Sequence, residues 1–131
     1  MNRVEKAEEL HKHGFNCAQA VAMAFADLYN IDKDQMARQT CAFGGGIAKQ
    51  QLTCGAVLAM CMLMGLEEGN SKSEEKEKRS RCYAETKRLC SLFREKYGST
   101  ECKDIIGKNP CREKVMLAAE LFDNYLKEKN N

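Results

Sequence analysis

Residues that interrupt a helix are scarce in this chain, and this scarcity constrains the fold more than any other feature. The 131 residues include one proline, Pro110, and nine glycines, so long stretches contain no breaker at all. No segment alternates between apolar and polar residues as a half-buried strand would. Hydrophobic residues make up 44% of the chain and charged residues 31%, which is enough apolar material for a globular core. We therefore predict an all-α fold, a single-domain helical bundle of about five to six helices over residues 1–131.

Capping residues and glycines divide the chain into the expected helices. These helices cover residues 4–13, 17–29, 33–42, 54–64, 74–97 and 110–128, and a short turn surrounds residue 102. The expected helix starts are Asn16 with Gln19 three residues later, Asp32, Thr53, Ser99 or Thr100, and Asn109 followed by Pro110. Gly14, Gly65 and Gly98 mark expected helix ends. The run Gly44, Gly45 and Gly46 predicts a loop whose backbone can adopt conformations closed to other residues.

Charge and hydropathy exclude several classes of function. The 21 basic and 19 acidic residues nearly balance and form no basic stripe, so we expect no nucleic acid as a partner. The longest uncharged apolar stretch, residues 56–66, is about half of the ~20 residues that a membrane span requires. Residues 1–14 lack the apolar segment of a signal peptide. We therefore expect a cytoplasmic protein with no membrane contact.

The chain contains eight cysteines, a large number for that compartment. Cytoplasmic thiols are kept reduced, so such cysteines more often serve metal binding or redox chemistry than a disulfide framework. The sequence contains no Cys-x-x-Cys and no Cys-x-x-Cys-His. This excludes a zinc ribbon, a thioredoxin motif and covalently attached haem, but spacing alone does not choose among the remaining sites.

Position on the expected helices sorts the cysteines into two groups. The helix-start cysteines, each in a first turn just after a capping residue, are Cys17, Cys54, Cys102 and Cys111. The others, inside helices or near a helix end, are Cys41, Cys61, Cys82 and Cys90. A helix start stabilises a thiolate through its unpaired N–H groups and its positive dipole end, so we expect the chemistry in the first group. In the second group we expect core packing, except that Cys41 adjoins the glycine loop and its role stays open.

The residues around the helix-start cysteines resemble those of the C_GCAxxG_C_C family of redox-active proteins, described by the pattern C…CGAxxG…C…C. The matching stretches are FNCAQAV around Cys17, FGGGIA at 43–48, CGA at 54–56, STEC at 99–102 and PC at 110–111. The resemblance runs from about Gly14 to Leu126, and its four defining cysteines correspond to the helix-start cysteines. The family motif ends in Gly where this chain has Ala59, and we expect the added methyl group to cause only a small adjustment.

The resemblance implies redox activity at these cysteines. A related domain occurs in split-Soret cytochromes, which are helical dimers with haem and an iron–sulfur centre, but this chain lacks the haem motif. Our first hypothesis is an iron–sulfur cluster for electron transfer, [2Fe–2S] in preference to [4Fe–4S], held by the helix-start cysteines. Backbone N–H groups of Gly44, Gly45, Gly46 and Gly55 would approach its sulfurs. We expect a protein redox partner rather than an enzyme substrate. The dimeric relatives, and a Met-rich helix that needs cover, suggest a homodimer.

Other functions stay open at this point. The same cysteines could exchange thiols and disulfides, with Cys54 as nucleophile and Cys17, Cys102 or Cys111 resolving. They could also bind zinc in a structural site with four cysteine ligands, or be incidental in a helical interaction protein. His11 and His13 precede Cys17 closely enough for a Cys–His pair, but Gly14 follows and predicts a polar, final-turn role for His13.

Overall fold

The computed structural model describes all 131 residues, and helices are its only extended regular elements. The α-helices are α1 (Arg3–Lys12), α2 (Cys17–Met23), α3 (Lys33–Thr40), α4 (Gly55–Glu68), α5 (Lys76–Tyr97), α6 (Cys102–Ile105) and α7 (Cys111–Lys129). Short 3₁₀ helices, Ala26–Tyr29 and Cys41–Phe43, follow α2 and α3. The all-α prediction is confirmed. The expected number of helices is too low, because residues 102–105 form a helical turn of their own.

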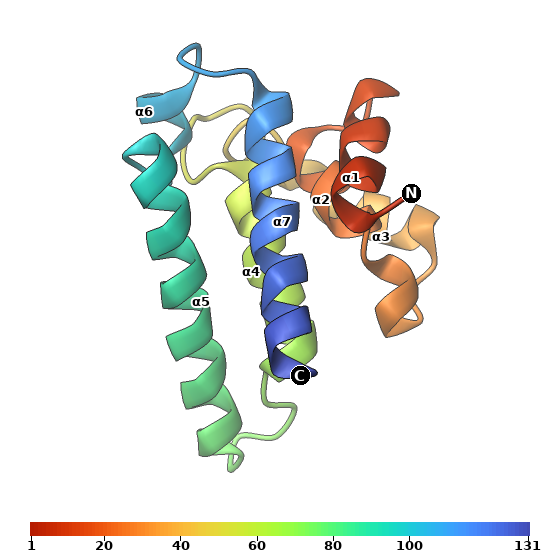
Figure 1. Cartoon of the computed structure of the whole chain (residues 1–131), viewed down its shortest axis with the longest axis vertical. Helices are drawn as coiled ribbons and strands as arrows, with labels where there is room; N and C mark the ends of the chain where they lie inside the picture. Colours follow the sequence, from red (N-terminus) through yellow and green to blue (C-terminus); the bar gives the residue numbers. More distant parts are fainter.

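The longest helices, α4, α5 and α7, lie side by side along the molecule, and α1 to α3 cover one side (Figure 1). α4 and α7 run in the same direction, and α5 runs in the opposite one (Figure 1). α4 packs against α2, α5 and α7, which explains why its residues 56–64 carry no charge. Met60 and Met64 are completely covered by the chain's own helices. The Met-rich helix therefore gives no argument for a homodimer, which stays a prediction from the resemblance alone.

One cluster of 25 buried apolar residues forms the core. Its largest fully buried side chains are Phe25, Phe93 and Phe122, and burial of each contributes about 1.5–3 kcal/mol. The rings of Phe25 and Phe122 meet edge to face with their centroids 5.1 Å apart. This contact joins the segment after α2 to α7.

The helix starts agree with the sequence in one case and differ in others. Asn16 caps α2 as predicted: its Oδ1 accepts the Gln19 N–H at 2.9 Å, and the Gln19 side chain accepts the Asn16 N–H at 3.1 Å. Asp32 precedes α3 but makes no side-chain cap bond. The predicted caps Thr53, Ser99 or Thr100, and Asn109 are wrong, because Cys54, Glu101 and Pro110 precede α4, α6 and α7. Thr53 instead forms an isolated antiparallel bridge with Glu101 and donates its hydroxyl to that carboxylate at 3.1 Å.

Two helices end elsewhere than predicted. α2 stops at Met23 rather than near Tyr29, and the Arg3 guanidinium donates a 2.9 Å hydrogen bond to the Ala24 carbonyl that a continuing helix would use. α4 continues through Gly65 to Glu68, although an interior glycine costs about 1 kcal/mol relative to alanine.

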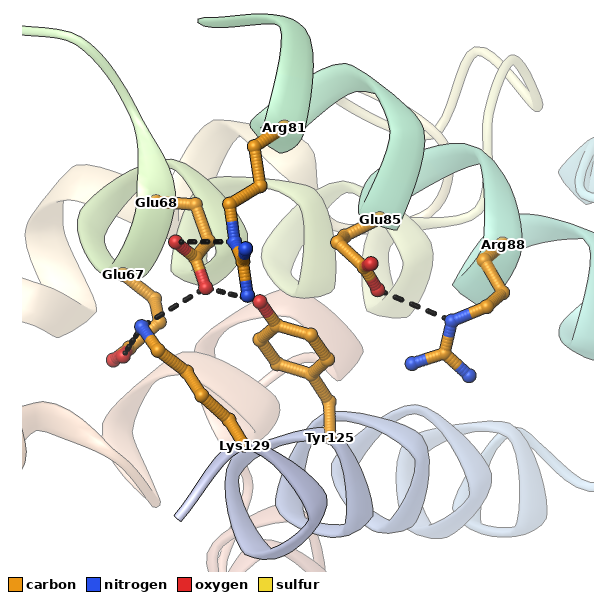
Figure 2. A network of polar contacts seen from close by, with 7 residues as sticks. All are labelled: Glu67, Glu68, Arg81, Glu85, Arg88, Tyr125 and Lys129. Carbon is orange, nitrogen blue, oxygen red and sulfur yellow. Dashed lines mark hydrogen bonds and ion pairs between the residues drawn. The ribbon is translucent and has the colours of Figure 1, made fainter. Parts of the chain in front are cut away.

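Polar contacts with α5 and α7 hold the last turn of α4 in place (Figure 2). Glu68 pairs with Arg81 of α5 at 3.2 Å and with Lys129 of α7 at 2.9 Å. The Tyr125 hydroxyl donates to the same carboxylate, and Glu67 binds Lys129 at 2.6 Å. Burial acts to raise the pKa of Glu68, but the hydrogen bonds from Tyr125 and Lys129 outweigh it and leave the pKa below its ordinary value. These contacts explain why the helix extends past its interior glycine.

Candidate functional site

The starts of several helices meet at the other end of α4 and α7 and enclose one cavity of about 210 Å³. All of the helix-start cysteines line this cysteine cavity: Cys17, Cys54, Cys102 and Cys111. Three of them are the first residues of α2, α6 and α7, and Cys54 directly precedes α4. The other lining residues are His11, Asn16, Gly45, Gly46, Gly55, Ile105, Ile106 and Lys114. The predicted position of the cysteines at helix starts is therefore confirmed, and the fold brings together thiols from both halves of the chain.

Gly55, the first residue of α4, allows Cys17 to lie against that helix. A Cβ atom at position 55 would be 2.6 Å from the Cys17 Sγ and 2.7 Å from the Phe43 carbonyl oxygen. Both distances are far below van der Waals contact, and one of the opposing atoms belongs to the backbone. Only glycine fits here without displacing its neighbours, so the Cys17 sulfur sits beside the residue that follows Cys54.

Two backbone hydrogen bonds fix Cys54 and Cys102 on neighbouring segments. The Cys54 N–H donates to the Thr100 carbonyl at 2.8 Å, and the Cys102 N–H donates to the Leu52 carbonyl at 2.6 Å. These bonds lie on either side of the isolated bridge between residues 53 and 101. The first turn of α6 is thereby held against the segment that leads into α4.

The glycine loop forms another wall of the cysteine cavity. Gly45 and Gly46 line it, and neither donates its N–H to a backbone carbonyl. Gly46 has a φ of +75°, and a Cβ there would lie 2.9 Å from the Cys102 Cβ. Gly44 does not line the cavity, and its missing side chain leaves space for Asn16, whose Nδ2 would be 2.5 Å from a Cβ. Of the predicted glycines, Gly44 thus supports the α2 cap, while Gly45, Gly46 and Gly55 border the cavity.

The backbone continues in the left-handed region after the glycines. The φ angles of Ile47, Ala48 and Lys49 are +62°, +53° and +62°, and Gln51 also has a φ of +62°. Each such residue costs about 1–2 kcal/mol. Hydrogen bonds back to residues 42–44 hold this segment, for example from the Ala48 N–H to the Ala42 carbonyl at 2.7 Å. Backbone strain of this kind is concentrated at functional sites in proteins, and here it adjoins the cysteine cavity.

Burial determines the acidity of two cavity thiols. Cys54 is 5% exposed, and burial raises its pKa to about 11, although the Val57 N–H at the helix start favours the thiolate. Burial and the nearby Cys111 also raise the pKa of Cys102. The expected lowering of the pKa at a helix start is therefore not found for these two thiols, because desolvation outweighs the helix dipole.

Lys114 is the functional candidate that sequence reasoning missed. It lies in the first turn of α7, lines the cysteine cavity and is only 2% exposed. Its Nζ donates to the Ile105 carbonyl at 2.8 Å, and its charge favours the Cys102 thiolate. A buried ammonium is costly unless it has partners. The available signal was its spacing: Lys114 follows Cys111 by one helical turn and therefore lies on the same face of the helix.

Of the remaining histidines and cysteines, only one lines the cysteine cavity. His11, at the end of α1, lines the cavity, whereas the His13 ring hydrogen-bonds the Glu9 carbonyl at 2.8 Å and is mostly exposed. Cys41 is exposed and does not line the cavity. Cys61, Cys82 and Cys90 also lie outside the cavity, half-buried against the core.

An all-helical fold with thiols gathered at its helix starts defines a class of cysteine-centred helical proteins. A family model described as "Putative redox-active protein (C_GCAxxG_C_C)" matches residues 15–125, and the chain belongs to this family. The description gives Gly-Cys-Ala-x-x-Gly, whereas residues 54–59 read Cys-Gly-Ala-Val-Leu-Ala, and Ala59 is completely buried in α4. Searches of the curated proteins and of the solved structures gave no match.

Two further observations concern metals and membranes. As the side chains stand, no group of three or more His, Cys, Asp or Glu residues is placed to hold a metal ion. Metal binding by the helix-start cysteines therefore stays a prediction. No helix combines the length and the apolar character that crossing a membrane demands.

Proposed function

We propose that this chain is a redox protein that binds an iron–sulfur cluster through Cys17, Cys54, Cys102 and Cys111 and exchanges electrons with a protein partner. The observation that supports the proposal is the convergence of these cysteines, each from a different helix start, on one cavity. Cysteines that serve only to pack in the core have no physical reason to lie at the starts of α2, α4, α6 and α7.

The donor set and its surroundings suit such a cluster. Four cysteine thiolates are the usual ligands of both [2Fe–2S] and [4Fe–4S] clusters. Gly46 and Gly55 leave room where a Cβ atom would press on Cys102 or Cys17. Positive helix ends and the Lys114 ammonium oppose the negative charge of bound thiolates. A bound cluster would supply one-electron chemistry, and we propose [2Fe–2S] ahead of [4Fe–4S].

The raised pKa of Cys54 disfavours a role for this thiol as a free nucleophile. Thiol–disulfide exchange proceeds through the thiolate, and a buried thiol with a pKa of about 11 is rarely ionised at neutral pH. A coordinating metal deprotonates its thiol ligands outright. Binding then releases protons, so loading should improve as the pH rises.

The cavity offers a partner a place to approach. Cys111 is exposed, and Ile106, which also lines the cavity, is 48% exposed. Leu52, whose carbonyl binds the start of α6, is 47% exposed. These apolar side chains beside the site fit contact with a protein surface. We propose this rim as the docking side for the redox partner.

The test is protein produced and purified without oxygen. We expect visible colour together with iron and acid-labile sulfide, about two of each per chain for [2Fe–2S] and about four for [4Fe–4S]. Cys54→Ser should abolish both, whereas the matched control Cys82→Ser, outside the cavity, should retain them. Zinc without iron would replace the proposal with a structural zinc site on the same four cysteines. Metal-free protein whose cavity thiols disappear in pairs on oxidation would replace it with a dithiol function.

A further inference from the structure

Two cysteines outside the cavity are in contact with each other. Cys61 lies in the middle of α4 and Cys90 in α5, and their Sγ atoms are 4.0 Å apart where these helices pack side by side (Figure 1). Both are partly exposed, and neither lines the cysteine cavity. Cys61 is two helical turns, about 10 Å along the axis, beyond Cys54. We propose that Cys61 and Cys90 form a second redox-active site, a dithiol that closes to a disulfide between α4 and α5.

Outside the cavity, the sulfurs in contact are those of Cys61 and Cys90, although the charge of Cys82 also reaches Cys61. A disulfide has an S–S bond of about 2.05 Å, so the two sulfurs have to approach by about 2 Å. Cys82 precedes Cys90 by eight residues on α5, about 12 Å along the axis, and cannot bridge to it. Cys41 is exposed at the end of α3, a helix without substantial contact with α5. Packing therefore favours the pairing of Cys61 with Cys90.

The surroundings give the two thiols different roles. The two sulfurs lie within hydrogen-bond distance, and this contact with Cys61, together with the charge of Arg94 one turn further along α5, lowers the pKa of Cys90 against the effect of burial. The same hydrogen bond, with burial, raises the pKa of Cys61. Cys90 is thus the attacking thiolate and Cys61 the resolving thiol, the reverse of the situation at the buried Cys54.

The oxidant in the reaction is hydrogen peroxide. The Cys90 thiolate attacks one peroxide oxygen, the O–O bond breaks, and the departing hydroxide takes up a proton to become water. The Cys61 thiol then attacks the sulfur of the Cys90 sulfenic acid, and the sulfenic oxygen leaves with protons as a second water. In total, two thiols and one peroxide give one disulfide and two waters. A small dithiol reductant reverses the change and is itself oxidised to a disulfide.

The test is peptide mapping of the full-length protein after hydrogen peroxide treatment. Free thiols are alkylated, and the protein is digested with trypsin without reduction. We expect residues 89–94, which contain Cys90, linked to residues 50–72, which contain both Cys54 and Cys61. Fragment spectra should place the link on Cys61. A dithiol reductant should restore both thiols, and Cys61→Ser should prevent the link while Cys82→Ser leaves it intact.

Several outcomes would overturn the proposal. The first is peroxide treatment that consumes the cavity thiols but forms no linked peptide. The second is a link that the fragment spectra assign to Cys54, and the third is a linked peptide that persists in Cys61→Ser. Mapping of the unsubstituted protein decides the matter even if a variant fails to fold. The iron and sulfide content of Cys90→Ser, measured in parallel, tests whether the Cys61–Cys90 site is independent of the proposed cluster. We expect both contents to equal those of the unsubstituted protein. Loss of the cluster proposal would leave the linked peptide unaffected.

Discussion

Replacing Gly55 by alanine should destabilise the protein and impair the cysteine cavity, although alanine is the better helix former. The new Cβ would meet the Cys17 Sγ at 2.6 Å and the Phe43 carbonyl oxygen at 2.7 Å. Overpacking of this kind costs about 1–3 kcal/mol. Gly65→Ala in the same helix is the matched control, because a Cβ there meets nothing within 4 Å and the exchange should stabilise by about 1 kcal/mol. The free energies of unfolding of the two variants should therefore differ by about 2–4 kcal/mol.

Urea denaturation of both variants, followed by circular dichroism, measures this difference. Iron and sulfide content provides an independent readout, and we expect Gly55→Ala to retain less of both than Gly65→Ala. If Gly55→Ala proves as stable as Gly65→Ala and binds as much iron, then the close approach of Cys17 to α4 does not limit the site, and the reasoning from the cavity geometry fails.

Three further predictions concern buried charges. Glu68→Gln should lower the free energy of unfolding by about 1.5–3 kcal/mol, since Arg81 and Lys129 lose the negative charge and one of its two acceptor oxygens. Glu128→Gln, at a side chain that is 66% exposed, should change it by less than about 1 kcal/mol in urea denaturation. Because its pKa is lowered in the folded protein, Glu68 contributes its full stabilisation above pH ~4.3, and this contribution is lost as the pH falls through the lowered pKa. A Glu68→Gln protein with the same sensitivity to acid would contradict this. Lys114→Met should lower the reduction potential of the proposed cluster, measured by spectroelectrochemistry, because a buried positive charge is lost. The same substitution at the exposed Lys108 should leave the potential unchanged. An unchanged potential in Lys114→Met would show that Lys114 has only a structural role.

Local signals in the sequence were sufficient to predict an all-α fold and the positions of the cavity cysteines near helix starts. Asn16 with Gln19 marks the start of α2, and the helix-start position of Cys17 follows directly. Even where the predicted cap is wrong, as at Thr53, the error is one residue and Cys54 still lies at the start of α4. Approximate helix boundaries are therefore enough to separate the helix-start cysteines from the other cysteines of the chain.

Features that depend on distant contacts could not be predicted. The end of α2 depends on Arg3, which binds the Ala24 carbonyl, and the extension of α4 depends on contacts of Glu68 with α5 and α7. The raised pKa of Cys54 was missed because burial, which no capping signal reports, outweighs the helix dipole. The contact between Cys61 and Cys90 was missed for a related reason, since it exists only once α4 and α5 pack together.

The distribution of the cavity walls along the chain has a consequence for biogenesis. Cys17 comes from an early helix, whereas Cys111 opens the last one, so a growing chain lacks a complete set of thiols until α7 has left the ribosome. Of these thiols, Cys54 belongs to the apolar core that joins the helices and Cys17 packs against it, whereas Cys102 and Cys111 lie outside it. Any ligand held by all of these thiols can therefore be bound completely only after Cys111 has been synthesised and α7 has packed against the earlier helices.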